Sequence, residues 1–128
     1  MALSYGQYDI ILVNLDPTVG SEIKKTRPCV IISPEEMNRH LNTIIIAPLT
    51  STPRNYPTRF QISPASGNSS GWLALDQLRT IDKKRALKTL GKLSPEDIMQ
   101  LKRLFWKCWW NKFWFDYCKR IRKILCYE

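Results

Sequence analysis

The chain has 128 residues, a common length for a single domain. It is 44% hydrophobic and 24% charged, a globular composition that excludes wholesale disorder. No apolar run approaches the roughly 18 residues of a membrane-spanning helix, and the N-terminus lacks the pattern of a secretory signal, so we expect a cytoplasmic protein. The net charge of +9 favours a polyanionic partner: nucleic acid, an anionic membrane surface or an acidic protein.

Short β-rich segments separated by turn signals make up most of the chain. Strands are predicted at residues 8–15, 28–33, 43–49, 58–63, 72–76 and 87–93. One or two helical turns are predicted at 34–41, and residues 77–85 form a polar run. A helix is predicted to begin after Ser94, because this serine can act as the N-cap and is followed by Pro95 and two acidic residues. This order predicts a mainly β protein, a small, strongly bent sheet or barrel with a C-terminal helix.

The C-terminal part of the chain differs from the rest. Residues 101–128 hold 8 Lys and Arg against 2 Asp and Glu, and nine of the fourteen aromatic residues. We therefore divide the chain into a domain at 1–104 and a basic, aromatic extension at 105–128. At helical spacing this region carries two apolar stripes that point in different directions, which predicts a break or second helix near 105–110, or an apolar face for something outside the domain. A dimer or partner surface, a helix on a membrane surface and an anomalous C-terminus stay open as its role.

Several common catalytic signatures are missing from the sequence. It contains no GxSxG, no phosphate-binding GxxxxGK and no HExxH. The four cysteines form no CxxC pair and His40 is the only histidine, which argues against a zinc site and against a mechanism that needs two imidazoles. We therefore expect neither a metal nor a cofactor.

Polar side chains gather where predicted strands begin and end. If strands 28–33 and 43–49 pair antiparallel, Arg27 lies near Thr50 and Ser51. Three residues at the end of the strand predicted at 72–76, or just beyond it, can reach the same rim: Asp76, Gln77 and Arg79. The lysine-rich loop that precedes Arg27 would overhang this rim. A guanidinium, a hydroxyl, a carboxylate and an amide around a basic groove suit a phosphodiester better than a neutral substrate.

The segments that carry these residues resemble the MazF/PemK-type toxins, the endoribonucleases of bacterial toxin–antitoxin pairs. The resembling segments are LDPTVGSE (15–22), KTRP (25–28), MN (37–38), APLTS (47–51), YPTR (56–59), LDQLRTID (75–82) and LGKLSPEDIMQL (90–101). They extend over roughly residues 5–103 in family order. The resemblance implies an SH3-like barrel with a C-terminal helix, a homodimer, sequence-selective and metal-independent cleavage of single-stranded RNA (mRNA), and a cognate antitoxin whose acidic, disordered tail covers the RNA groove.

The resemblance also implies roles for single residues. Arg27 and Thr50 match the family's central catalytic pair, and Asp76 matches an acidic position with catalytic or RNA-binding roles. RNA contacts are expected, from the resemblance or from their place on the rim, at Ser21, Glu22, Lys24, Lys25, Ser51, Gln77 and Arg79. Asp76 could instead cap the local backbone or pair with Arg79. Ala74 stands where some members have an arginine, so an acid–base scheme built on that arginine does not carry over.

The chemistry of RNA cleavage fits this set of residues. RNA supplies its own nucleophile, the ribose 2′-OH, so the enzyme has to align the reacting atoms and stabilise the charge on the phosphorane oxygens. Arg27 can do so with two parallel hydrogen bonds, and Thr50 can donate another. A pKa above about 12 makes the arginine a poor base, so electrostatic stabilisation is its expected role. The alternative function in this fold class is that of the CcdB-like toxins, which bind DNA gyrase and cleave nothing.

Overall fold

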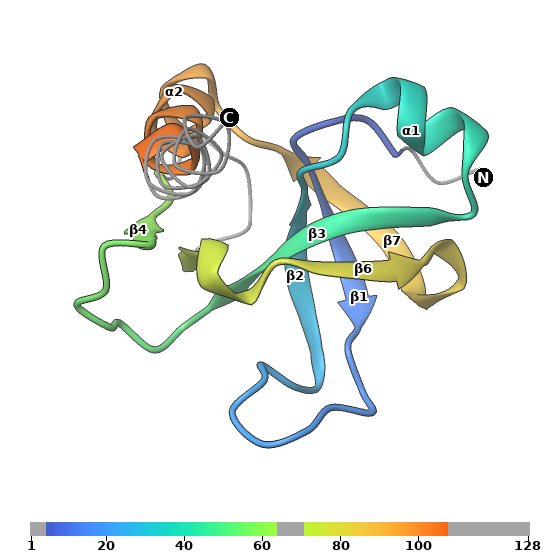
Figure 1. Ribbon diagram of the computed structural model, residues 1–128, viewed down its shortest axis with the longest axis horizontal. Helices are drawn as coiled ribbons and strands as arrows, with labels where there is room; N and C mark the ends of the chain where they lie inside the picture. The colour runs from blue at the N-terminus through green and yellow to red at the C-terminus, as the bar shows by residue number, and fades with distance from the viewer. Residues whose placement is uncertain (1–4, 64–70, 108–128) are drawn as a thin grey trace, which may run out of the picture.

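The computed structural model of the chain describes residues 5–63 and 71–107 (Figure 1). Its strands are β1 (Asp9–Asn14), β2 (Thr26–Ile31), β3 (Thr43–Thr50), β4 (Arg59–Gln61), β5 (Trp72–Ala74), β6 (Arg79–Asp82) and β7 (Ala86–Lys92). Its helices are α1 (Glu35–His40) and α2 (Pro95–Phe105), with short 3-10 turns at η2 (Leu75–Gln77) and η3 (Lys83–Arg85). The predictions for residues 108–128 lie outside the described residues.

One bent antiparallel sheet forms the body of the molecule. Its strands run in the order β4-β5-β3-β2-β1-β7, and β6 pairs with β3 beside this path. β3 is the central strand: residues 46–48 pair with β2, residues 43–46 pair with β6, and Leu49 and Thr50 pair with β5. A strand with neighbours on both edges and cores on both faces must be apolar along its length, and the run TIIIAPL meets this requirement.

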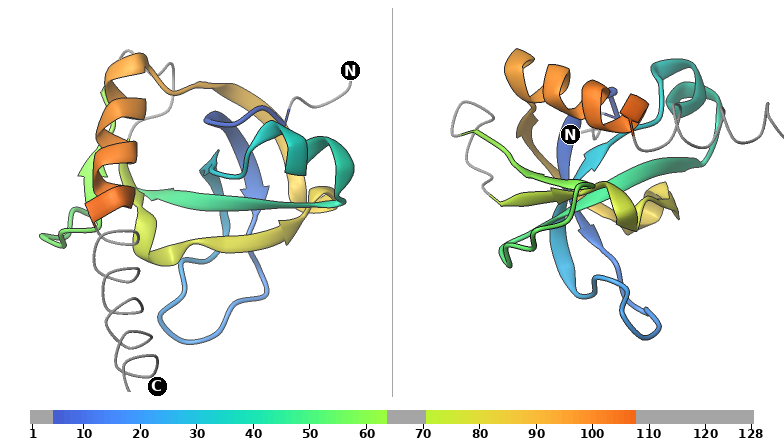
Figure 2. Two further views of the ribbon diagram at one scale, coloured as in Figure 1. Left: turned by 45° about the horizontal axis from the view of Figure 1, so that its top comes forward. Right: turned by 60° about the vertical axis from the view of Figure 1, so that its left-hand side comes forward.

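The sheet has a hydrophobic core on each of its two faces. Successive residues of one strand point to opposite faces, so Ile10 and Val30 pack into one core while Ile11 and Ile31 pack into the other. The core that contains Ile10 and Val30 also receives Leu101 from α2. This helix therefore covers one face, and it lies at the opposite end of the molecule from the β1–β2 loop, residues 15–25 (Figures 1 and 2).

Local capping fixes where α2 begins. The Ser94 side chain accepts a hydrogen bond from the Asp97 backbone N–H at 3.3 Å, as its sequence position predicts. Asp97 in turn accepts hydrogen bonds from the backbone N–H and the hydroxyl of Ser63, at 2.9 and 3.0 Å. The start of the helix is thus attached to the chain that follows β4.

The structure confirms the mainly β class, the bent sheet and the C-terminal helix. The helical turns predicted at 34–41 form α1, with Pro34 as its N-cap rather than its first residue. β6 lies inside the polar run 77–85 and was not predicted as a strand, because only Ile81 among its four residues is buried. Within residues 5–63 and 71–107, no helix combines the length and the apolar character that crossing a membrane requires.

Candidate active site

The register between β2 and β3 brings Arg27 and Thr50 to the same level of the sheet. The pairing of β2 with β3 ends at Cys29 and Pro48, and Arg27 and Thr50 each lie two residues beyond this pair, in positions that the same register would set opposite one another. Arg27 is half-buried, and its Nε donates a hydrogen bond to the Lys24 carbonyl oxygen at 2.9 Å. The structure thus places the predicted catalytic pair on adjacent strands, with Arg27 as the second residue of β2, directly after the β1–β2 loop, and Thr50 as the last residue of β3.

Thr50 is tightly surrounded. Only 6% of the residue is exposed, and its Oγ1 accepts a hydrogen bond from the Thr52 backbone N–H at 3.3 Å. Gly71, just before β5, approaches it so closely that an added Cβ would lie 2.9 Å from the Thr50 carbonyl oxygen. The φ of Gly71 is +141°, which side-chain-bearing residues rarely adopt. A glycine is therefore required where the chain enters β5 against the end of β3.

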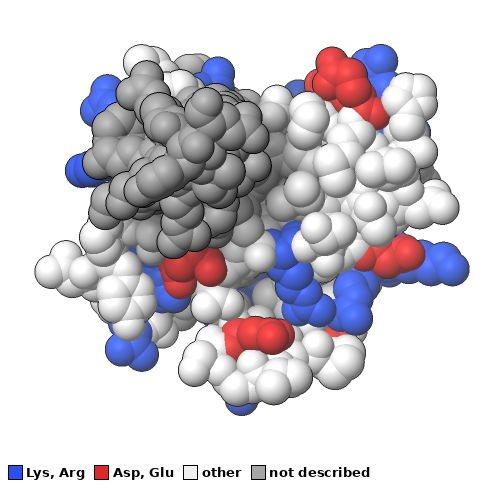
Figure 3. Space-filling view, viewed as in Figure 1, with Lys and Arg blue, Asp and Glu red and all other residues white. Residues whose placement is uncertain are grey.

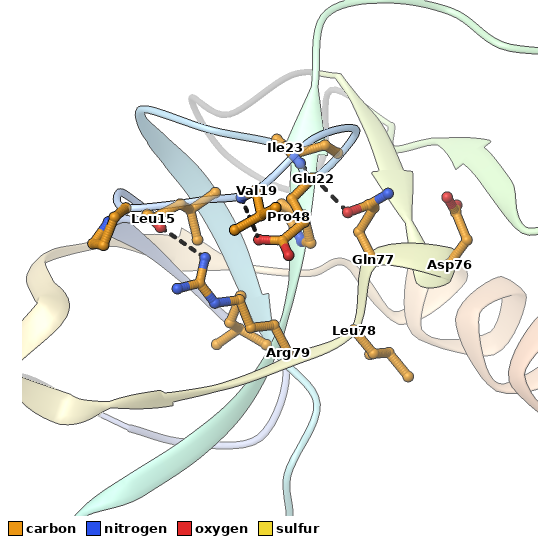
Figure 4. Close-up of a pocket in the computed structure, with 11 residues that line it drawn as sticks. Leu15, Val19, Glu22, Ile23, Pro48, Asp76, Gln77, Leu78 and Arg79 are labelled. Atoms are coloured by element: carbon orange, nitrogen blue, oxygen red, sulfur yellow. Dashed lines mark hydrogen bonds between the residues drawn. The ribbon is translucent and has the colours of Figure 1, made fainter.

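A cavity of about 460 Å³ lies between the β1–β2 loop and the sheet (Figure 4). Its apolar walls are Leu15, Pro17, Val19, Ile23, Ile46, Pro48 and Leu78, and its polar residues are Glu22, Asp76, Gln77 and Arg79. The cavity thus collects four of the predicted site residues. Its lining does not include Arg27 and Thr50.

The β1–β2 loop is tied to the sheet on both sides of the cavity. Arg79 Nη1 donates a hydrogen bond to the Leu15 carbonyl oxygen at 2.7 Å, and Arg85 Nη1 donates to the Asp16 carbonyl oxygen at 2.7 Å. On the other side, the Ile23 backbone N–H donates to Gln77 Oε1 at 3.4 Å (Figure 4). In this structure Arg79 and Gln77, both predicted RNA contacts, hold the loop over the cavity.

Most of the other predicted RNA contacts are exposed. Ser21, Lys24 and Lys25 lie on the surface of the loop, and Ser51 is exposed just beyond the end of β3. Glu22 is also exposed, and its Oε2 accepts a hydrogen bond from the Val19 backbone N–H at 3.3 Å. Figure 3 shows that basic and acidic side chains interleave across the lower half of the face seen in Figure 1, so this surface carries both signs of charge.

Asp76 is held by an arginine that the sequence analysis did not single out. Arg59, the first residue of β4, donates from Nε to Asp76 Oδ1 and from Nη2 to Asp76 Oδ2, both at 3.0 Å. The Thr58 hydroxyl donates a further hydrogen bond to Oδ1 at 3.0 Å. The alternative prediction that Asp76 pairs with Arg79 is wrong, because the Arg79 guanidinium donates to the Leu15 carbonyl oxygen in the β1–β2 loop.

The ion pair shifts both titrations. Partial burial by itself would raise the pKa of Asp76, but the hydrogen bonds from Arg59 and Thr58 hold it below its ordinary value. The hydrogen bond to Asp76 likewise raises the pKa of Arg59. The Arg59 guanidinium also lies 4.9 Å from the centre of the Tyr56 ring, within the range of a cation–π contact. Asp76 is therefore a fixed carboxylate at neutral pH.

Two other groups of side chains bear on the chemistry. Cys29 is fully buried in the core, and burial raises the pKa of its thiol to about 12, so it does not supply a thiolate nucleophile near neutral pH. Across the part of the chain that the structure describes, no three His, Cys, Asp or Glu side chains come together as a set that could hold a metal ion.

Comparison with known proteins gives a consistent result. The chain is 30% identical over 95 residues to the endoribonuclease toxin MazF of Escherichia coli strain K12, a match that covers 73% of this chain and 84% of that one. The fold is similar to the crystal structure of MazF from Deinococcus radiodurans, with a TM-score of 0.72, 20% identity and coverage of 84% and 96%. It is also similar to an endoribonuclease from a mycobacterial species in complex with its cognate antitoxin, with a TM-score of 0.70, 21% identity and coverage of 81% and 93%.

The match to the family extends over most of the chain. The family model described as "PemK-like, MazF-like toxin of type II toxin-antitoxin system" matches residues 6–107. These residues include the whole sheet, both helices and every predicted site residue. The chain belongs to the PemK-like, MazF-like family of toxins of type II toxin–antitoxin systems.

Proposed function

We propose that this chain is the toxin of a type II toxin–antitoxin pair and that it cleaves single-stranded RNA without a metal ion. Family membership and the endoribonuclease named among its relatives support this proposal. The observation that carries it is the pairing of β2 with β3, whose register, continued by two residues, would set Arg27 opposite Thr50, together with a cavity of about 460 Å³ that is lined in part by Pro48 of β3. No comparable observation favours a gyrase-binding toxin.

The proposed reaction is an internal transesterification. The ribose 2′-oxygen attacks the neighbouring phosphorus and loses its proton, the bond from phosphorus to the 5′-oxygen breaks, and this oxygen takes up a proton. Arg27 stabilises the charge on the phosphorane oxygens, and the Thr50 hydroxyl donates a hydrogen bond to the same group. The Arg27 Nε–H donates to the Lys24 carbonyl oxygen, which orients the guanidinium and leaves its two Nη groups to donate to the phosphorane oxygens.

The remaining predicted residues form the surrounding RNA surface. We assign RNA contacts to the exposed side chains of the loop and of the end of β3: Ser21, Glu22, Lys24, Lys25 and Ser51. Asp76 forms part of the catalytic rim, and Gln77 and Arg79 contact RNA from the cavity beneath the β1–β2 loop. Residues 1–104 would then be the catalytic domain, with residues 105–128 as an extension outside it.

The partners follow from the same proposal. The structural relatives include an endoribonuclease in complex with its cognate antitoxin and a MazE–MazF complex. We propose that an antitoxin with an acidic tail covers the surface around Lys24 and Lys25, that the toxin acts as a homodimer, and that it meets mRNA in the cytoplasm.

The nucleophile provides the test. An RNA whose scissile ribose is replaced by 2′-deoxyribose should bind but stay intact, because the attacking oxygen is missing. Products of the normal RNA should carry a 2′,3′-cyclic phosphate and a free 5′-OH, and EDTA should not slow the reaction. Efficient cleavage of the deoxy-substituted strand would falsify the proposal and indicate an external nucleophile.

A further inference from the structure

The cavity beneath the β1–β2 loop is lined by two acidic side chains, which would repel the phosphates of a bound RNA. Two carboxylates, Glu22 and Asp76, line a space that the proposed function fills with a polyanion. A carboxylate and a phosphate repel one another, so a negative side chain in this position must be neutralised or must contact something other than phosphate.

Arg59 neutralises one of the two carboxylates. Only 9% of its side chain is exposed, against 29% for the side chain of Asp76. The Nε and Nη2 atoms of Arg59 both donate to the Asp76 carboxylate, and the flat face of the Arg59 guanidinium lies against the Tyr56 ring. The guanidinium is therefore committed to Asp76 and is poorly placed to bind phosphate itself.

The strand register makes room for this ion pair. Arg59 faces Ala74 in the β4–β5 pair, and residues directly opposite one another project from the same side of a sheet. The single methyl group of Ala74 leaves that side open for the long arginine side chain. Asp76 follows in η2, within reach of its end.

An ionised carboxylate held in this way can only accept hydrogen bonds. Phosphate has no hydrogen to donate at neutral pH, so the donors available in RNA are the N–H groups of the bases and the ribose 2′-OH. The apolar walls of the cavity, among them Pro17, Ile23 and Pro48, suit the flat face of a base better than a ribose. In Figure 4 the amide of Gln77 lies next to Asp76 on the same side of the cavity, with its oxygen engaged by the Ile23 N–H.

We propose that Arg59 is a positioning residue, which fixes Asp76 as a hydrogen-bond acceptor for the amino group of one adenine or cytosine base of the RNA. This inference rests on the proposed function. Adenine and cytosine each present an amino group beside a ring nitrogen that can accept, and these match the carboxylate of Asp76 and the amide nitrogen of Gln77. Uracil instead presents its one N–H between two carbonyl oxygens, which would face the carboxylate. Guanine, in the orientation that brings its amino group to Asp76, would turn its ring N–H, a second donor, toward the amide nitrogen of Gln77.

The same arrangement argues against a proton-transfer role for Asp76. The hydrogen bonds from Arg59 and Thr58 stabilise the ionised form, which makes the carboxylate a weak base and leaves it without a proton to give near neutral pH. Asp76 would therefore determine which RNA is cleaved, while Arg27 and Thr50 act at the phosphorus.

The first experiment maps the ends produced from a long RNA of mixed sequence. It compares the wild type with Asp76→Asn, Arg59→Gln and Arg59→Lys, and with Arg39→Gln as the matched control. Arg39 also makes an ion pair, at 3.2 Å with Glu35, but on the exposed surface of α1. We expect the wild type to require adenine or cytosine at one position beside the cut, and discrimination against uracil there to fall about tenfold in Asp76→Asn and Arg59→Gln. Arg59→Lys should retain only part of the discrimination against uracil, because an ammonium group cannot hold both carboxylate oxygens.

The second experiment removes only the amino group. In a short RNA of the mapped sequence, the base at that position is replaced by purine or by pyrimidin-2-one, the analogues of adenine and cytosine without this group. The kcat/KM of the wild type should fall about tenfold, mainly through KM. The kcat/KM of Asp76→Asn and of Arg59→Gln should not fall further, because these variants have already lost the contact to the amino group. Thermal unfolding of each variant checks the fold, and Asp76→Asn, which keeps the shape of the side chain, carries the test if Arg59→Gln unfolds.

Several outcomes would overturn the inference. Loss of kcat in Asp76→Asn with an unchanged base requirement would make this residue a proton-transfer group. A tenfold loss on removing the 2′-OH, rather than the amino group, of the same nucleotide would assign the contact to ribose. An equal effect of Arg39→Gln would show a general charge effect. If the wild type cleaves no RNA at all, the proposed function itself fails; if it cleaves without any base requirement, only this inference fails.

Discussion

Arg27 is the residue on which the proposed chemistry depends most. Its planar guanidinium is the one group at the end of β2 that can contact two phosphorane oxygens at once. We expect Arg27→Ala to lower kcat/KM by about 10²–10³, or about 3–4 kcal/mol of transition-state stabilisation, by analogy with the loss of one preorganised donor. Arg27→Lys should recover little, since a point charge does not reproduce the fork. Single-turnover cleavage of a labelled RNA measures these effects.

Thr50 provides the comparison for this prediction. Thr50→Ala should cost less than Arg27→Ala because it removes a single neutral hydrogen bond, and Thr50→Ser should be mild because it keeps the hydroxyl. Arg27→Ala with nearly full activity and an intact fold by circular dichroism would contradict the electrostatic role.

Single residues also show how far the sequence can predict the site. Arg27 and Thr50 lie near the ends of two apolar strands, so local pattern and one antiparallel pairing were enough to predict that they lie on adjacent strands. The partner of Asp76 could not be found in this way. Arg59 meets it through the pairing of two three-residue strands, and nothing in the local sequence specifies their register.

Among the elements, the β1–β2 loop decides access to the cavity. Arg79 holds it through a charge-assisted hydrogen bond to the Leu15 carbonyl oxygen, and such bonds contribute about 1.5–3 kcal/mol. In Arg79→Ala we therefore expect amide hydrogen exchange in residues 15–25 to become roughly tenfold faster or more. Exchange in β3 should not change.

Arg85 limits how far the β1–β2 loop is released in Arg79→Ala. Its hydrogen bond to the Asp16 carbonyl oxygen remains in the variant, so the loop should loosen without being released. Arg39→Ala, on the exposed face of α1, serves as the control. Unchanged exchange in the loop of Arg79→Ala would mean that other contacts hold the loop.

The elements also differ in how readily they are predicted. β1, β2 and β3 are apolar on both faces because a core lies on each side of the sheet, and their sequences show this directly. β6 pairs only with β3 and buries a single isoleucine, so its hydrogen bonds, which leave no trace in the pattern of side chains, define it as a strand.

At the scale of the whole molecule, the net charge determines how RNA binding depends on salt. The net charge of +9 predicts that binding of an uncleavable RNA, with 2′-deoxyribose at the scissile position, weakens as salt rises. For single-stranded RNA the logarithm of the affinity should fall by about 0.7 per phosphate contact for each tenfold rise in salt. Reversing Lys24 and Lys25 to glutamate should make this slope shallower.

Fluorescence anisotropy at several salt concentrations measures the slope. Arg39→Glu is the control, since α1 lies away from the β1–β2 loop (Figure 1). An affinity that does not depend on salt, or an equal change in the control, would place the RNA elsewhere on the molecule.

Gly71 limits how this enzyme can be redesigned. A side chain at position 71 would press on the carbonyl oxygen of Thr50, so mutagenesis at the entry to β5 also perturbs the proposed catalytic centre. A library meant to change RNA preference should therefore keep this glycine and vary Tyr56, Glu22 and Gln77 instead. A clone that loses activity through Gly71→Ala would otherwise be scored as defective in recognition, when the change had displaced the end of β3.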